Sequence, residues 1–123
     1  MSNSGIELGR RGEQIAVSFL KDKGYKIVSI NYRTKLGQID IVARENKTIC
    51  FVEVKTRKTS RFGKPIDAVG YFKQRKISQV ALMFLKENKL LDSQARFDII
   101  SIVYPGKIEL IKNAFELDQH YLY

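Results

Sequence analysis

Two carboxylates and a lysine lie within the most apolar part of the sequence. Asp40 belongs to the segment GQIDIVAR, and Glu53 and Lys55 belong to the segment ICFVEVK, which follows after a short polar stretch. Burying a charged side chain is costly unless the charge is paired or binds a metal ion. Two carboxylates held close together repel unless one is protonated or a cation lies between them. The pattern therefore favours a cation site, provided that the fold brings Asp40 and Glu53 together.

The ligand types point to one kind of cation and one kind of chemistry. Oxygen ligands from Asp40, Glu53 and the backbone carbonyl of Val54 suit a hard ion, Mg²⁺ or Mn²⁺. Because strand side chains alternate, Lys55 shares the face of Glu53, where it would position an attacking water and offset charge in a transition state. Metal, water and lysine are the parts needed for phosphodiester hydrolysis. The alternative is a solvated Glu53–Lys55 pair with an incidental Asp40, and the commonness of E-x-K favours it when the motif stands alone.

The hydrophobic pattern along the chain predicts the elements that must position these residues. Apolar residues at helical spacing predict two helices, over residues 6–23 and 71–91, with Gly24 ending the first. Alternating and β-branched segments predict five strands, over residues 25–33, 38–44, 47–55, 96–104 and 107–111. Residues 59–70 are typical of a loop. This order predicts one α/β domain over residues 1–123, a mixed central β-sheet flanked by helices, with loose ends at 1–5 and 117–123.

The second and third strands form a hairpin whose turn decides the geometry of the acidic pair. A turn at residues 45–48 pairs Arg44 with Ile49. The same register puts Asp40 directly opposite Glu53, with Cβ atoms about 4.5–5.5 Å apart. The hairpin therefore predicts that the two carboxylates share one cation.

Glu13 is a candidate further acid, carried by the first helix. It faces the same side as Ala16 and Leu20, and Gly9 and Gly12 would let that helix approach the sheet closely. Two interpretations stay open for Glu13: a ligand of the metal site, or a first-turn glutamate stabilised by the helix dipole.

Composition indicates a basic protein without a Cys/His zinc site. The chain has 22 Lys+Arg against 13 Asp+Glu, a net charge of +9, with one Cys and one His. Such a charge either serves solubility or favours a polyanionic partner, nucleic acid before membrane. No apolar run approaches the roughly 20 residues of a membrane span, and no secretory signal is evident. We therefore expect a cytoplasmic protein with no membrane partner.

Basic residues cluster after the third strand and at the start of the second helix. The candidates for nucleic-acid binding are Arg57, Lys58, Arg61, Lys64, Lys73, Arg75 and Lys76. They suit salt-sensitive phosphate contacts that do not read base sequence, and Phe62 and Tyr71 are candidates for base stacking. For any single basic residue, a solvated surface position is the commoner outcome. Nothing is typical of a base-reading helix, so structure-selective binding is favoured.

Several segments occur in an order that resembles a known family. They are GRRGEQIAVSFLKDKGYKIVSINYRTKLGQIDIVA, CFVEVKTR, GKPIDAV and RFDIISI. They resemble the YraN-like family of uncharacterised bacterial proteins, which is assigned to the restriction-endonuclease-like, or PD-(D/E)xK, nuclease superfamily near the archaeal Holliday-junction resolvases. The resemblance covers residues 9–115. It implies that Asp40, Glu53 and Lys55 form the D…ExK motif and that Glu13 is the helical acid that several resolvase-like members add to the metal site.

Two further positions bear on this resemblance. Asp98, in RFDII, also matches the family pattern, and its place on a different predicted strand favours a structural role. The family usually shows Gly-Glu-Ile-Asp where this chain has Gly-Gln38-Ile-Asp40. A potential acidic ligand is thus neutral, which counts against a second metal ion.

The sequence favours a Mg²⁺- or Mn²⁺-dependent DNA endonuclease that hydrolyses phosphodiester bonds, structure-selective on branched or damaged DNA. One alternative is a nucleic-acid-binding protein with the nuclease fold and little or no catalytic activity. Another is a protein-interaction scaffold on that fold. Resolvase-like proteins often dimerise, so a homodimer is expected by analogy alone.

Overall fold

A computed structural model of the chain describes residues 4–58, 69–104 and 106–115. The elements are α1 (Ser4–Asp22), β1 (Lys26–Thr34), β2 (Gly37–Glu45), β3 (Thr48–Arg57), α2 (Tyr71–Glu87), β4 (Ala95–Val103) and β5 (Lys107–Phe115). The predicted order of one helix, three strands, one helix and two strands is confirmed. Helix α1 begins at Ser4, inside the segment that was expected to be loose. Neither helix, within the residues described, has the length and apolarity that crossing a membrane requires.

The five strands form one mixed sheet in the order β1-β2-β3-β4-β5. Neighbouring strands are antiparallel except for β3 and β4, which run parallel. A parallel pair needs a crossover connection, and α2 supplies it. The mixed sheet predicted from the element order is therefore confirmed.

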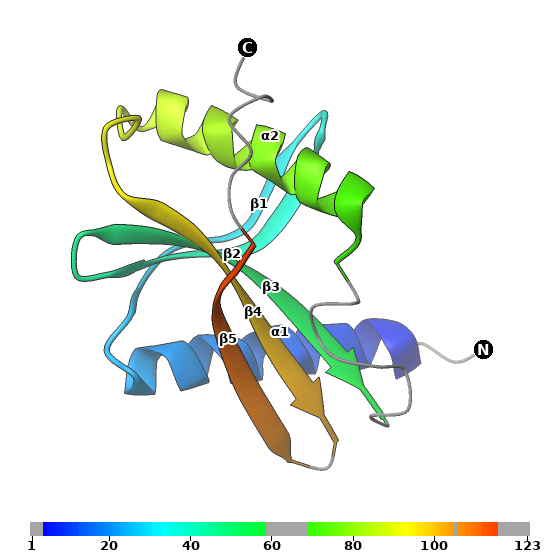
Figure 1. The fold of residues 1–123 in the computed structure, drawn as a ribbon. Helices are drawn as coiled ribbons and strands as arrows, with labels where there is room; N and C mark the ends of the chain where they lie inside the picture. Colours follow the sequence, from blue (N-terminus) through cyan, green and yellow to red (C-terminus); the bar gives the residue numbers. More distant parts are fainter. Residues whose placement is uncertain (1–3, 59–68, 105, 116–123) are drawn as a thin grey trace.

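The two helices cover opposite faces of the sheet (Figure 1). The core on the α2 side contains Ile77, Val80, Ala81, Phe84 and Leu85 of the helix with Ile49, Phe51, Phe97 and Ile99 of the strands. The core on the α1 side contains Ala16 and Leu20 of the helix with Ile41, Ala43, Cys50, Val52, Ile100 and Ile102. The alternation predicted for β3 is thus confirmed. Side chains from β3 alternate between the two helices, and the Glu53 face is the α2 face.

Helix α2 ends at Glu87, four residues before the end of the predicted helix. Lys89 adopts a left-handed backbone conformation with φ of 57°, and the Leu90 N–H bonds the Leu85 carbonyl at 2.7 Å. This is the Schellman arrangement that closes helix C-termini. Leu90 contacts the core from outside the helix, which is why its apolar character extended the helical pattern.

The β2–β3 hairpin turns through two residues, Asn46 and Lys47, rather than the four predicted. Asn46 has a positive φ of 54°, as two-residue hairpin turns require. Glu45 pairs with Thr48, and the predicted pairing of Arg44 with Ile49 is confirmed. Shortening the turn by one residue at each end leaves the predicted register unchanged from Glu45–Thr48 to Ile41–Val52. The predicted pairing of Asp40 with Glu53 lies one step beyond the last paired residues.

Helix α1 crosses β3 closely at Gly12. A Cβ atom at this position would overlap the Cγ2 methyl group of Thr56 in β3. A Cβ atom at Gly9 would meet nothing within 4 Å. Of the two glycines expected to allow close approach, Gly12 is therefore the one that the packing requires.

We expect Gly12→Ala to destabilise the fold by about 1–3 kcal/mol, because the added methyl group overpacks the α1–β3 contact. Gly9→Ala is the matched control, and it should stabilise the helix by about 0.5–1 kcal/mol. Thr56→Ser removes the opposing methyl group and should recover most of the Gly12→Ala loss. Urea unfolding of the single and double variants measures all three effects. Equal effects at Gly9 and Gly12 would contradict the close contact.

Candidate active site

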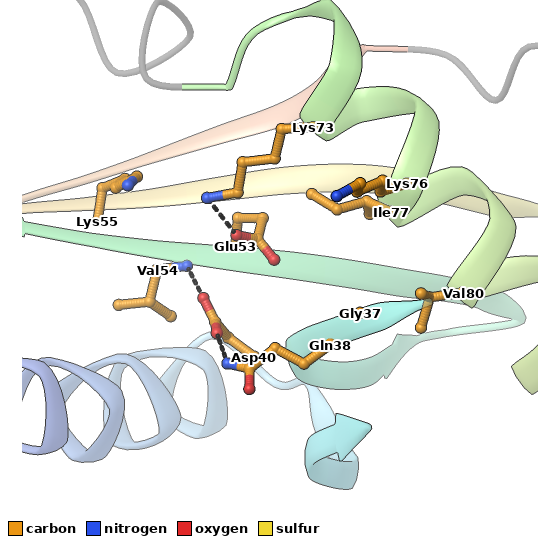
Figure 2. A pocket seen from close by; sticks show the side chains of 10 residues that line it. All are labelled: Gly37, Gln38, Asp40, Glu53, Val54, Lys55, Lys73, Lys76, Ile77 and Val80. Carbon is orange, nitrogen blue, oxygen red and sulfur yellow. Dashed lines mark hydrogen bonds and ion pairs between the residues drawn. The ribbon is translucent and has the colours of Figure 1, made fainter. Parts of the chain in front are cut away.

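Asp40, Glu53 and Lys55 line one pocket of about 370 Å³ between the sheet and α2. Figure 2 shows Asp40 reaching in from β2, Glu53 from β3 and two lysines from α2. The complete lining consists of Gly37, Gln38, Asp40, Glu53, Val54, Lys55, Lys73, Lys76, Ile77 and Val80. The structure thus brings together the two carboxylates and the lysine that the sequence singled out.

Asp40 lies where β2 and β3 stop pairing. Their last paired residues are Ile41 and Val52, and beyond them the Val54 N–H donates to Oδ2 of Asp40 at 2.8 Å. The carboxylate therefore takes the place of a further backbone hydrogen bond between the strands. Its Oδ1 accepts from the Gln38 side-chain amide at 3.2 Å. Both oxygens are held, so the orientation of the carboxylate in the pocket is fixed by its neighbours.

Glu53 is the buried acid of the site. It is 5% exposed, and its Oε2 lies 3.2 Å from Nζ of Lys73 in α2. Burial and, to a smaller extent, the charge of Asp40 raise the pKa of Glu53, Lys73 and Lys55 act in the opposite direction, and the net result is a pKa of about 7. A carboxylate in this setting gains from any cation that can approach it.

Lys55 lies beside Glu53 without being its ion-pair partner. Within the described residues, the ion pair of Glu53 is made by Lys73, and Lys55 pairs with no carboxylate. Burial lowers the pKa of Lys55, and the nearby ammonium group of Lys73 lowers it further. A solvated Glu53–Lys55 pair, the alternative raised by the sequence, is therefore wrong, since Glu53 is buried and pairs elsewhere.

The donor set of the pocket fits a hard divalent cation with two protein carboxylates. The side-chain atoms of the pocket that could bind a metal ion are carboxylate oxygens. Mg²⁺ in proteins is usually held by one or two carboxylates together with water and phosphate oxygens. Over the described part of the chain, no group of three Asp, Glu, His or Cys side chains converges on a metal position. The Val54 carbonyl as a third ligand stays a prediction.

Glu13 lies outside this pocket. It lines a separate depression between α1 and β1, and its Oε2 accepts from the Asn31 side-chain amide at 3.2 Å. Asn31 has a positive φ of 56°, in a strand whose pairing with β2 is also irregular. The structure thus does not bring Glu13 together with Asp40 and Glu53, and its role as a ligand is not supported by this arrangement.

The predicted nucleic-acid contacts divide into three groups. Lys73 and Lys76 line the pocket itself. Arg57 is the last residue of β3, Lys58 follows it directly, and Arg75 belongs to α2. Lys58 and Arg75 are exposed. Arg61, Phe62 and Lys64 lie outside the described residues.

Two aromatic rings stand at the start of α2. Tyr71 is 61% exposed and Phe72 is 77% exposed, with their ring centroids 5.7 Å apart. Tyr71 was a candidate for base stacking, and Phe72 is a second ring in the same position. The sequence signal for Phe72 was its adjacency to Tyr71 and to the basic cluster.

Asp98 lies away from the pocket, in β4. It is fully buried, and its carboxylate accepts from Nε of Arg96 at 3.0 Å and from the Asn113 backbone N–H at 2.9 Å. The pairing of β4 with β5 is interrupted between Phe97 and Ile99, so Asp98 bonds a backbone group at that irregularity. These contacts agree with the structural role favoured by the sequence.

Comparison with known proteins identifies the relatives of this chain. The model of uncharacterised protein family UPF0102 matches residues 12–102. A UPF0102 protein of Geobacter metallireducens is 52% identical over 120 residues, which cover 95% of this chain and 98% of that protein. A UPF0102 protein of Geotalea daltonii is 50% identical over 119 residues, 94% of each chain.

The chain belongs to the UPF0102 family. A UPF0102 protein of Caldicellulosiruptor saccharolyticus is 46% identical over 114 residues, covering 89% of this chain and 97% of that protein. The resemblance to the YraN-like family is thereby confirmed. The matched residues include the whole hairpin with Asp40 and Glu53, and α2 with Lys73.

Sequence reasoning missed one contact in this UPF0102 chain, the ion pair between Lys73 and Glu53. Lys73 was expected to meet phosphate, not a carboxylate of the site. The available signal was its spacing, because Lys73, Ile77 and Val80 recur at i, i+4 and i+7 on one side of α2. Lys73 therefore extends the buried stripe of the helix toward the pocket.

The raised pKa of Glu53 makes the stability of this UPF0102 protein depend on pH. The pKa is about 7 in the fold against an ordinary 4.5, so between these values the folded state binds more protons than the unfolded state. The contribution of Glu53 to stability is therefore largest below pH 4.5 and is lost as the pH rises to about 7, a change of about 3 kcal/mol in all.

Glu53→Gln should remove this fall and leave the metal-free protein more stable than the unmodified one above the window. Urea unfolding across the pH series measures it, with exposed Glu109→Gln as the matched control. Parallel stability curves for the unmodified protein and Glu53→Gln would contradict the assignment.

Proposed function

We propose that the protein is a Mg²⁺- or Mn²⁺-dependent endonuclease that hydrolyses phosphodiester bonds in DNA. The observation that carries this proposal is the pocket in which Asp40, Glu53 and Lys55 meet. A buried carboxylate whose pKa is raised, in part by a second carboxylate, is a common property of a functional site. The reaction class follows from the ligand types and from the lysine beside them.

Each residue of the pocket has a defined part in this proposal. Asp40 and Glu53 would hold the metal ion, and the backbone and Gln38 contacts keep the Asp40 carboxylate oriented. When bound, Mg²⁺ or Mn²⁺ supplies a water of lowered pKa and stabilises charge on phosphoryl oxygens. Lys55 has no carboxylate partner among the described residues, so its ammonium group is available to offset charge on the reacting phosphate.

The start of α2 supports a polyanionic substrate. Its first turn has no acidic residue, and Lys73, Arg75 and Lys76 all lie within its first six residues. Positive charge near a helix N-terminus opposes the helix dipole and costs a few tenths of a kcal/mol or more per charge, so folding alone does not favour it. A bound phosphate group would offset this unfavourable concentration of positive charge. The exposed rings of Tyr71 and Phe72 beside these cations suit unpaired bases, as in branched or damaged DNA.

One observation favours a second candidate, a DNA-binding protein of low activity. Gln38 stands where the family usually has glutamate, and its amide donates to Oδ1 of Asp40. A neutral side chain that occupies one carboxylate oxygen reduces the negative charge offered to a metal ion. In this second candidate the protein binds DNA through the same basic surface but cleaves it slowly or not at all.

The test is purified protein with Mg²⁺ or Mn²⁺ against single-stranded, duplex, flap and four-way-junction DNA. Metal-dependent cleavage that prefers a branched or single-stranded form supports the endonuclease. Salt-sensitive binding without cleavage under either ion supports the second candidate. Absence of DNA binding at low salt would contradict both and would leave a protein-interaction scaffold.

A further inference from the structure

We propose that Lys73 is an exchangeable counter-ion of the acidic site: its ammonium group holds Glu53 in the metal-free protein and leaves when a divalent cation binds. This inference rests on the proposed function, because it assumes that Glu53 is a metal ligand. It assigns to Lys73 a positioning role that differs from those of Lys55 and of the surface lysines.

The contact itself is specific. Nζ of Lys73 lies 3.2 Å from Oε2 of Glu53, and Figure 2 shows the lysine side chain extending from α2 across the pocket to reach it. The Glu53 side chain is 7% exposed and that of Lys73 is 41% exposed. The glutamate is thus fixed in the wall of the pocket, whereas the lysine side chain is partly open to solvent. Of the two partners, the lysine is the one that can move away.

The lysine and a metal ion exclude one another at this carboxylate. An ammonium group has three donors and no acceptor, so it cannot coordinate a metal and can only compete for the same oxygen. Like charges a few ångströms apart in a partly buried site repel strongly. Lys55 and Lys76 already line the same pocket, so a divalent cation added beside all three lysines would create a large excess of positive charge. Departure of Lys73 relieves it.

A phosphate group would favour that departure. Lys73 lies between Lys55 and Lys76 on the wall of the pocket, so a DNA phosphate at the mouth would draw its ammonium group away from Glu53. The freed carboxylate then binds metal more tightly. Because binding free energies are reciprocal, the metal in turn strengthens DNA binding through the same lysine.

The experiment measures Mn²⁺ affinity by isothermal titration calorimetry on the metal-free full chain, without DNA, at a pH above the range in which Glu53 takes up a proton. Lys73→Met should bind Mn²⁺ about tenfold more tightly than the unmodified protein, because the competitor is gone. Lys73→Arg, which keeps the cation, should stay within about twofold or bind more weakly. Lys76→Met is the matched control: it removes the same charge from the same pocket and should change the affinity less than about threefold.

Thermal unfolding supplies a second readout. Without metal, Lys73→Met should melt below the unmodified protein because Glu53 has lost its counter-ion, and saturating Mn²⁺ should close that gap. A gap that persists with Mn²⁺ would mean that the ion pair is purely structural.

Equal tightening in Lys73→Met and Lys76→Met would overturn the inference in favour of a general charge effect. Weaker Mn²⁺ binding by Lys73→Met would overturn it as well. Either result, obtained with a protein that still binds Mn²⁺ and cleaves DNA, leaves the proposed function intact. Absence of Mn²⁺ binding in every variant would contradict the metal site itself and the inference with it.

Discussion

Lys55→Ala should lower the rate of DNA cleavage by a factor of about 10²–10⁴ while the protein remains folded and still binds metal. The reason is that Lys55 pairs with no carboxylate in the described part of the chain, so its removal leaves no buried charge without a partner. Its contribution is made to the reacting phosphate and appears in turnover, not in ground-state binding. Metal affinity should rise slightly or stay unchanged, since one positive charge leaves the pocket.

The measurement is single-turnover cleavage at saturating DNA, with urea unfolding and Mn²⁺ titration of the same preparation. Lys58→Ala is the matched control, because Lys58 is exposed just after β3 and lies outside the pocket lining. It should weaken DNA binding and leave the saturated rate within about threefold. A Lys55→Ala protein that cleaves normally, or that loses stability instead of turnover, would contradict the catalytic role.

Asp98→Ala should lower the free energy of unfolding by about 3–5 kcal/mol, more than Gly12→Ala. The carboxylate is fully buried and bonds both the Arg96 side chain and the backbone N–H of Asn113. Arg96 also donates to Glu45 at 2.7 Å and to the Tyr25 hydroxyl at 2.8 Å, so Asp98 supports a network that links β2, β4 and β5. Truncation leaves the Asn113 N–H without its acceptor and reduces the charge compensation of Arg96.

Asp98→Asn separates the two contributions, because it keeps an oxygen for the Asn113 N–H and removes only the charge. We expect its loss to be roughly half that of Asp98→Ala. Urea unfolding measures both variants. Cleavage per folded molecule, assayed well below the melting temperature, should be unchanged in each. An Asp98→Asn protein of normal stability and no activity would instead place Asp98 in the chemistry.

The hairpin that carries the acidic pair was predictable because its determinants are local. Side-chain alternation and a short polar turn decide the register, and both are visible within residues 37–57. The same reasoning placed Lys55 on the face of Glu53. It could not foresee that the strands stop pairing at Ile41 and Val52, because that separation is stabilised by the Asp40 side chain itself.

Long-range contacts account for what the sequence left undetermined. The last predicted strand, over residues 107–111, was too short because Lys112 and Asn113 are polar. The strand continues to Phe115, since Asp98 accepts the Asn113 N–H and the Phe115 ring stacks on Phe97 at 4.5 Å. Glu13 was undetermined for the same reason: its partner, Asn31, belongs to another element.

The two-residue turn at Asn46 and Lys47 makes chain length, rather than residue type, the quantity under strictest constraint in this hairpin. An insertion or deletion of one residue there would shift β2 against β3 by one position, and a one-residue slip moves every side chain of a strand to the other face. Asp40 would then turn away from Glu53, and the apolar residues of β2 would exchange helices. Gaps between the two acids should therefore be rare among functional relatives, whereas Lys47 can vary more than Asn46, whose positive φ favours Asn or Gly.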